Sequence, residues 1–115
     1  VLCGDYNVIP TPDDARNPAA WVDDALFQPE SRAAFRALCN LGLSDSHELG
    51  HEPTGTFTFW DYQAGAWQRD HGIRIDFHLL SPQAADRFWS VQTHRQARDM
   101  DKPSDHVPVV VTLED

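Results

Sequence analysis

Alternation between hydrophobic and polar positions predicts most of the strands in this chain. Residues 56–60 alternate threonine with aromatic side chains, and residues 73–80 form a second run rich in isoleucine, leucine and phenylalanine. β-Branched and aromatic residues in such runs are typical of strands. A glycine-containing loop joins the two runs, so we expect them to be neighbouring strands. Two further strands are predicted at 88–95 and 107–113, and residues 1–3 read as a buried strand.

One clear helix is predicted, over residues 31–41. Its hydrophobic side chains recur at helical spacing, Ser31 is a suitable N-cap, and Gly42 provides a C-terminal stop. A shorter helix is predicted at 82–87. Residues 8–30 contain several prolines among polar residues and predict an ordered loop. Strands mixed with a helix indicate an α/β or α+β layered sheet.

The length of 115 residues fits a single domain. No hydrophobic run approaches the roughly 18 residues that a membrane-spanning helix needs, so no membrane association is expected. Cys3 and Cys39 have no metal-ligand spacing, and we expect buried free thiols of a reducing compartment. The sequence opens inside a predicted strand and without an initiator methionine, which predicts a piece of a longer protein.

Charge narrows the functions that the sequence allows. The chain has 9 basic and 18 acidic residues and a net charge of −9, which argues against binding nucleic acid through a general positive field. Most of the basic residues lie after residue 57. A polyanionic substrate therefore requires these local arginines, or a divalent cation between the substrate and the carboxylates.

Asp5 and Asn7 lie two residues apart at the end of the first predicted strand. Functional residues of α/β folds gather at strand ends. The carboxylate of Asp5 can align a water molecule or a proton, and Asn7 can donate to a phosphoryl oxygen. An Asx-rich turn that only ends the strand explains the same residues.

Asp76 is an ionisable residue inside a hydrophobic strand, where an unpaired charge is costly. It needs a partner, and two kinds are open: an arginine such as Arg74 in a structural ion pair, or a catalytic partner. His106 follows Asp105 at the start of the last predicted strand. An imidazole oriented by a carboxylate such as Asp76 can act on water or stabilise charge that develops on a phosphoryl group.

Phe59 and Trp60, beside the 61–72 loop, can stack against a base or a sugar. The alternative is a core role, which is the commoner one for aromatic residues of an alternating strand. Arg69 and Arg74 are candidates for phosphate contacts, with loop charge and strand pairing as the other interpretations. The remaining histidines fit no metal spacing and are interpreted as surface or core residues: His47, His51, His71, His78 and His94.

Four segments carry these candidates, in the order Gly4–Asn7, Thr58–Tyr62, Gly72–Asp76 and Ser104–Pro108. Together they resemble the exonuclease III family of the endonuclease/exonuclease/phosphatase superfamily, over nearly all 115 residues. The resemblance implies a four-layer α/β sandwich of the DNase I-like type. It also implies that residues 1–115 are roughly the C-terminal half of a single domain.

The activity that the resemblance implies is that of a Mg²⁺-dependent exodeoxyribonuclease, with Mn²⁺ as an alternative metal. Such an enzyme hydrolyses double-stranded DNA in the 3' to 5' direction and cleaves 5' to abasic sites. The bound cation neutralises and polarises the phosphate, so a net-negative protein can still act on DNA. A cytoplasmic location, with no membrane partner, follows from the same resemblance.

The resemblance also implies a role for individual residues, position by position, and the following roles are expectations from it. Asp5 aligns the attacking water or protonates the leaving oxygen, and Asn7 contacts the scissile phosphate. Asp76 orients His106, which bonds the phosphate or assists the nucleophile. Asp105 lies at or near the metal, for which Asp5 and Asn7 are further candidate ligands. The side chains expected to receive an abasic deoxyribose or contact the substrate are Phe59, Trp60, Ile73 and Arg74.

Several residues of the family pattern belong to its N-terminal half: the principal metal-binding glutamate, an asparagine, and the tyrosine and lysine of the phosphate site. We therefore expect this chain alone to be inactive or impaired, and its exposed inner face to favour self-association. Two alternatives stay open. One is a superfamily phosphoesterase acting on lipid or inositol phosphates, and the other is a non-catalytic fragment that binds DNA or a protein.

Overall fold

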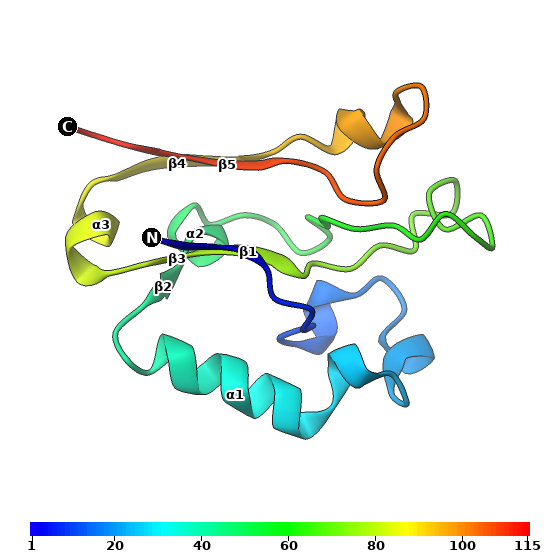
Figure 1. Cartoon of the computed structure of the whole chain (residues 1–115), viewed down its shortest axis with the longest axis horizontal. Helices are drawn as coiled ribbons and strands as arrows, with labels where there is room; N and C mark the ends of the chain where they lie inside the picture. The colour runs from blue at the N-terminus through cyan, green and yellow to red at the C-terminus, as the bar shows by residue number, and fades with distance from the viewer.

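A computed structural model describes residues 1–115 as two small antiparallel sheets with one long helix beside them (Figure 1). The strands are β1 (Leu2–Asp5), β2 (Ser44–Asp45), β3 (Asp76–Leu80), β4 (Phe88–Thr93) and β5 (Val109–Leu113). The three-stranded sheet has the order β1-β3-β2, and the second sheet pairs β4 with β5.

Three α-helices connect the strands: α1 (Pro29–Cys39), α2 (Ser46–Leu49) and α3 (Pro82–Asp86). Figure 1 shows α1 on one side of the three-stranded sheet and the β4-β5 pair on the other. The proline-rich stretch that was predicted to be an ordered loop contains three short 3₁₀ turns, Pro12–Asp14, Pro18–Trp21 and Ala25–Phe27, and a fourth spans Arg95–Asp99. The longest helix has 11 residues, and none meets the length and hydrophobicity of a membrane-spanning helix.

The hydrophobic core is divided among the layers. Phe35 of α1 packs with Val8, Phe77 and Leu79 between the helix and the three-stranded sheet. A second cluster joins the 3₁₀ turns to the segment before β3: Ile9, Ala15, Phe27, Ile73 and Ile75. A third cluster, Phe57, Trp60 and Val107, lies between the loops that precede β3 and β5. The core therefore holds fixed the two loops from which β3 and β5 begin.

Most predicted elements are present with shifted bounds. The strands predicted at 73–80, 88–95 and 107–113 appear as β3, β4 and β5, and the short helix at 82–87 appears as α3. The predicted strand at 56–60 is wrong. In that segment Phe59 forms isolated bridges to Ile73 and to His106 and no continuous ladder.

The main helix begins two residues earlier than predicted. Its first residue is Pro29 and its N-cap is Gln28, whereas Ser31 lies inside the helix and donates to the carbonyl of Ala25. Proline is favoured at the first helical position because the N–H that it lacks has no partner there. The helix ends at Cys39, and Gly42 follows the end with a φ of +103°.

The prediction of a buried first strand is also wrong. All four residues of β1 are exposed, because β1 lies at the edge of its sheet and pairs only with β3. Cys3 and Cys39 are free thiols as predicted, but Cys3 is exposed and Cys39 is half-buried. Hydrophobic residues at an exposed sheet edge form a surface that can pair with further chain.

Candidate active site

Two antiparallel strands bring the first pair of candidate residues together. Asp5 is the last residue of β1 and lies directly opposite Asp76, the first residue of β3. Residues paired in this way place their side chains on the same face of the sheet, about 5 Å apart at Cβ. Two carboxylates far apart in the sequence therefore meet at one end of the sheet, as the strand-end argument predicts.

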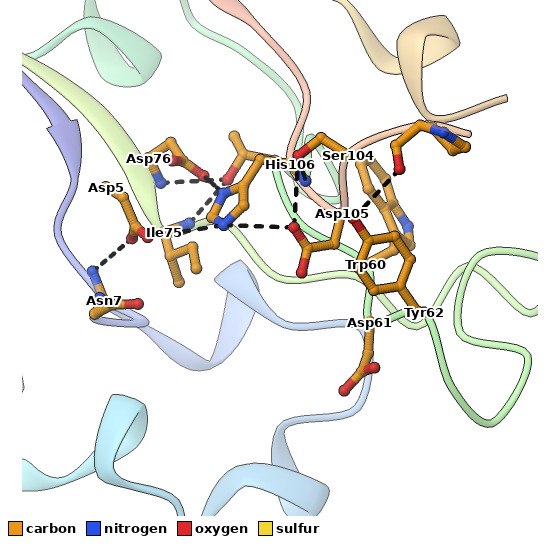
Figure 2. Close-up of polar contacts among 12 residues, drawn as sticks. Asp5, Asn7, Trp60, Asp61, Tyr62, Ile75, Asp76, Ser104, Asp105 and His106 are labelled. Carbon is orange, nitrogen blue, oxygen red and sulfur yellow. Dashed lines mark hydrogen bonds and ion pairs between the residues drawn. The ribbon is translucent and has the colours of Figure 1, made fainter. Parts of the chain in front are cut away.

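His106 adds an imidazole to this pair from the loop before β5. Its Nδ1 lies 2.9 Å from Oδ2 of Asp76, and its Nε2 lies 3.7 Å from Oδ2 of Asp5 and 4.0 Å from Oδ1 of Asp105 (Figure 2). The ring packs edge-on against Phe59, with 5.1 Å between ring centroids. The partner that Asp76 needs is thus His106.

The hydrogen bond to Asp76 fixes the orientation of the imidazole. In neutral His106, Nδ1 donates to Asp76, which leaves Nε2 as an acceptor facing Asp5 and Asp105. Burial lowers the pKa of His106, but the hydrogen bond to Asp76 and the charges of the three carboxylates outweigh burial and raise that pKa. The contacts of Nε2 are longer than a hydrogen bond, so this atom is available to water or to a substrate.

Asn7 completes the end of β1 in a constrained conformation. Its backbone N–H donates to Oδ1 of Asp5 at 2.9 Å, which holds that carboxylate in place. Its φ is +50°, in the left-handed region that asparagine tolerates better than most residues. The Asx turn that was the alternative interpretation is therefore present, and the exposed carboxamide remains free to contact a ligand.

A group of possible metal ligands lies at this point. One ligand atom each from Asp5, Asp76 and His106 lies within 4.8 Å of the other two. Asp105, which was predicted as a ligand together with Asp5 and Asn7, is not a member of this group, although its Oδ1 lies 4.0 Å from Nε2 of His106. Carboxylate oxygens are the donors that hard divalent cations prefer, so the donor chemistry fits such a cation.

The predicted sugar pocket is only partly presented at the surface. Trp60 and Ile73 are completely buried, and the indole Nε1 of Trp60 donates to Asp70 at 2.9 Å. Phe59 is half-buried and contacts the ring of His106. The core role weighed as the alternative therefore applies to Trp60, whereas Phe59 presents its ring at the site.

Arg74 does not lie at this site. Its side chain is buried, and its guanidinium donates to Asp14 at 2.7 Å and to Asp45 at 2.8 Å. Burial lowers the pKa of Arg74, but Asp45 and Asp14 outweigh burial and raise it. The predicted substrate contact of Arg74 is replaced by a structural ion pair, because Asp14 and Asp45 occupy the guanidinium group that a phosphate needs. Arg69 stays at the surface, on the 61–72 loop.

Sequence reasoning missed two hydroxyl residues that support the site. Ser104 Oγ accepts from the backbone N–H of His106 at 3.1 Å, and Thr58 Oγ accepts from the backbone N–H groups of Ile75 and Asp76. In the sequence, these two residues stand out only as a threonine between two aromatic residues and a serine two residues before a histidine. Neither pattern by itself indicates a partner.

Comparison with known proteins places this geometry in a family. Residues 1–106 match the Endonuclease/Exonuclease/phosphatase family. Exodeoxyribonuclease III of Haemophilus influenzae is 33% identical over 116 residues, which cover 95% of this chain and 43% of that protein. The solved structure of the Neisseria 3' phosphatase NExo, a variant bound to a product DNA hairpin, has a TM-score of 0.93 and 33% identity.

An AP endonuclease from Archaeoglobus fulgidus has a similar structure, with a TM-score of 0.89 and 34% identity, over 96% of this chain and 44% of that one. The match to NExo covers 98% of this chain and 44% of that chain. The chain therefore spans less than half the length of each of these three proteins. Its fold is the DNase I-like α/β fold of these enzymes, as predicted, and represents a part of their domain.

Proposed function

The chain belongs to the Endonuclease/Exonuclease/phosphatase family, and on that premise we propose that the complete protein is a metal-dependent DNA-repair nuclease. It hydrolyses phosphodiester bonds as a 3' to 5' exonuclease and by cleavage 5' to abasic sites. Residues 1–115 form the C-terminal half of its single catalytic domain. The observation that carries the proposal is the group of Asp5, Asp76 and His106 at adjoining strand ends.

The chemistry of this group suits the hydrolysis of a phosphodiester. Asp76 holds the imidazole of His106 through the 2.9 Å contact, so that Nε2 points toward the space beside Asp5. In the protonated ring, which the raised pKa of His106 favours, the N–H at Nε2 can donate to a phosphoryl oxygen, and the Asp5 carboxylate can accept a proton from an attacking water. Asn7, tied to Asp5 through its backbone, contributes its carboxamide to the scissile phosphate.

A divalent cation fits the oxygen donors of this site, and we propose Mg²⁺, which Mn²⁺ can replace. Asp5 is the proposed principal ligand of this chain, with two further candidates: Asp105, 4.0 Å from Nε2 of His106, and Asn7, bonded to Asp5 through its backbone N–H. When bound, the metal supplies charge neutralisation and polarisation of the phosphate. The three carboxylates of the cluster make a bound cation necessary, because without it they repel an approaching phosphate.

The proposed substrate is double-stranded DNA, including DNA with an abasic site. Support comes from the names of the similar proteins, which include an exodeoxyribonuclease III, an AP endonuclease and a 3' phosphatase bound to a DNA product. Phe59 beside His106 is the side chain that can contact the sugar. A cytoplasmic location and self-association of the 115-residue chain through its exposed inner face remain predictions.

The test is cleavage of labelled DNA by the full-length protein. The substrates are a duplex with one abasic site, an intact duplex with a recessed 3' end, and a duplex with a 3'-phosphate. We expect cleavage with Mg²⁺ and none with EDTA. The 115-residue chain, tested in parallel, is expected to be inactive or impaired, because it spans only part of the domain of its relatives.

Two variants tie the activity to the cluster. His106→Ala and Asp5→Asn are each expected to lower the cleavage rate about 100-fold or more, which is the usual size of a general acid or base contribution. His94→Ala is the matched control, because it removes an imidazole that contacts none of the three carboxylates. A His106→Ala or Asp5→Asn protein that cleaves at a near-normal rate contradicts the assignment.

A further inference from the structure

We propose that Thr58 is a positioning residue that sets the geometry between Asp76 and His106. It touches no reacting atom and acts through the backbone of Asp76 and of Val107, the residue that follows His106. The inference rests on the proposed function, because it assigns Thr58 a part in that reaction. It starts from the segment 56–60, whose predicted strand is interrupted.

The hydroxyl of Thr58 holds the beginning of β3. Its Oγ accepts from the backbone N–H of Ile75 at 3.1 Å and from the backbone N–H of Asp76 at 3.2 Å. The side chain is 2% exposed, so water does not compete for these contacts. A hydroxyl oxygen has two lone pairs, which matches two donors. The residue that carries the catalytic carboxylate is therefore held through its own backbone.

The backbone of the same segment holds His106. The carbonyl of Thr58 accepts from the N–H of Val107 at 2.9 Å, and the N–H of Trp60 donates to the carbonyl of Asp105, also at 2.9 Å. These two bonds bracket His106 on both sides. Figure 2 shows Ile75, Asp76 and His106 side by side at this junction.

Thr58 thus connects the segment that carries Asp76 with the segment that carries His106. The backbone N–H of Thr58 also donates to the carbonyl of Ile73 at 2.9 Å, so Thr58 is bonded to the segment that leads into β3. The hydroxyl takes the place that a strand carbonyl has in a ladder, and this explains why residues 56–60 form only isolated bridges. Because Thr58 bonds both Asp76 and the residue after His106, it holds the two residues relative to each other.

Small displacements of Asp76 relative to His106 are expected to lower the rate of cleavage. The contact between Asp76 and His106 is 2.9 Å, and a shift of one ångström takes it beyond hydrogen-bond distance. Replacing the hydroxyl by a methyl group leaves two buried N–H groups without an acceptor. Because buried donors are rarely left unpaired, the beginning of β3 is expected to move toward other acceptors.

The experiment compares Thr58→Val with Thr58→Ser in the full-length protein, on the abasic duplex with Mg²⁺. Valine keeps the shape of threonine without the acceptor, and serine keeps the acceptor without the methyl group. We expect kcat of Thr58→Val to fall about 10- to 100-fold, the size of effect that a misplacement of one ångström has. KM is expected to stay within about twofold, and Thr58→Ser to recover kcat to within about threefold.

A control separates positioning from general loss of stability. Leu80→Ala removes a completely buried side chain at the far end of β3, away from Asp76. It is expected to destabilise the protein and to leave kcat unchanged at temperatures where it is folded.

If Thr58→Val does not fold, Thr58→Cys tests the same point. A thiol is a weak acceptor, so a smaller fall in kcat is expected. A wild-type kcat in either variant, or a Thr58→Ser protein as slow as Thr58→Val, overturns the proposal.

A second measurement does not depend on cleavage. ¹⁵N NMR of histidine-labelled full-length protein reports which ring nitrogen of His106 carries the proton, with His106→Ala providing the assignment. We expect protonated Nδ1 bonded to Asp76 in the wild type and loss of this preference in Thr58→Val. An unchanged spectrum in Thr58→Val overturns the role of Thr58. A wild-type protein that shows the expected spectrum but cleaves no DNA contradicts the proposed function instead.

Discussion

Arg74 and Asp76 lie two residues apart in the chain but belong to two different ionic clusters. The two clusters differ in how deeply their charged side chains are buried. Around Arg74, all three side chains are less than one-tenth exposed, and both ion pairs are shorter than 3 Å. Around His106, the side chains of Asp5, Asp105 and the imidazole are about one-third exposed, and only the Asp76 contact is short. In the first cluster the guanidinium is bonded to both carboxylates, whereas the second cluster leaves Nε2 without a hydrogen bond.

The difference teaches how to separate structural from chemical charge in this fold. A buried, fully bonded cluster holds loops together, as Arg74 does between the first 3₁₀ turn and β2. A half-exposed cluster with an unfilled donor or acceptor can exchange partners with water, metal or substrate. Both clusters have more acidic than basic groups, so charge excess alone does not identify the site.

The largest effect is expected in the buried cluster of Arg74, Asp14 and Asp45. Arg74→Met removes the guanidinium and leaves the carboxylates of Asp14 and Asp45 buried without a counter-charge. Breaking a buried ion pair in this way typically costs about 3–5 kcal/mol of the free energy of unfolding. Denaturant unfolding of Arg74→Met and Asp76→Asn checks this. Asp76→Asn alters the more exposed cluster and is expected to cost about 1 kcal/mol. Equal losses in the two variants contradict the distinction.

The next comparison uses two neighbouring aromatic residues with opposite expected outcomes. Trp60→Ala empties a completely buried site and is expected to lower the free energy of unfolding by about 3 kcal/mol or more. Phe59→Ala is expected to cost less stability and to weaken the preference for abasic over intact duplex about tenfold, a loss near 1.4 kcal/mol. Unfolding curves and competition cleavage measure the two effects. An unchanged preference in Phe59→Ala refutes its contact with the sugar.

The smallest effect concerns a third cluster, around Asp70, which is about as exposed as the proposed site. Burial raises the pKa of Asp70, but hydrogen bonds from Arg95, Trp60 and Arg16 outweigh it and lower that pKa. A lowered pKa contributes stability that is fully present above the usual value near 3.8 and is lost as pH falls through the lowered value. We expect this contribution to be below about 1 kcal/mol, because the arginines are half exposed.

Urea unfolding of the wild type and of Asp70→Asn at neutral pH and near pH 3 measures that contribution. The two proteins should differ at neutral pH and converge in acid. A difference that persists or grows as the pH falls has the wrong sign for a carboxylate with a lowered pKa, and contradicts the interpretation of this cluster.

Much of the site could be predicted because its residues stand at recognisable places in short segments. Asp5 follows a strand and Asp76 interrupts a hydrophobic one, so each required either a turn or a partner. The choice between Arg74 and His106 as the partner of Asp76 could not be made from the residues themselves. It depends on Asp14 and Asp45, which reach Arg74 from distant loops.

The errors in the fold have related causes. Residues 56–60 have the composition of a strand, but the Thr58 side chain replaces a backbone acceptor and interrupts the ladder. The first strand is hydrophobic and still exposed, because it lies at the edge of its sheet and pairs only with β3. Local patterns indicate what a segment favours, whereas the hydrogen bonds to Thr58 and the edge position of β1 decided these two cases.

The central claim is that Asp76 and His106 act as one unit. The most direct test is a double-mutant cycle of Asp76→Asn and His106→Ala, with kcat measured on the abasic duplex in Mg²⁺. Each single variant is expected to be about 100-fold slower or more. If Asp76 works only by orienting His106, the double variant is no more than about twofold slower than His106→Ala. A double variant in which the two losses multiply contradicts the claim and assigns Asp76 an independent role, such as metal binding.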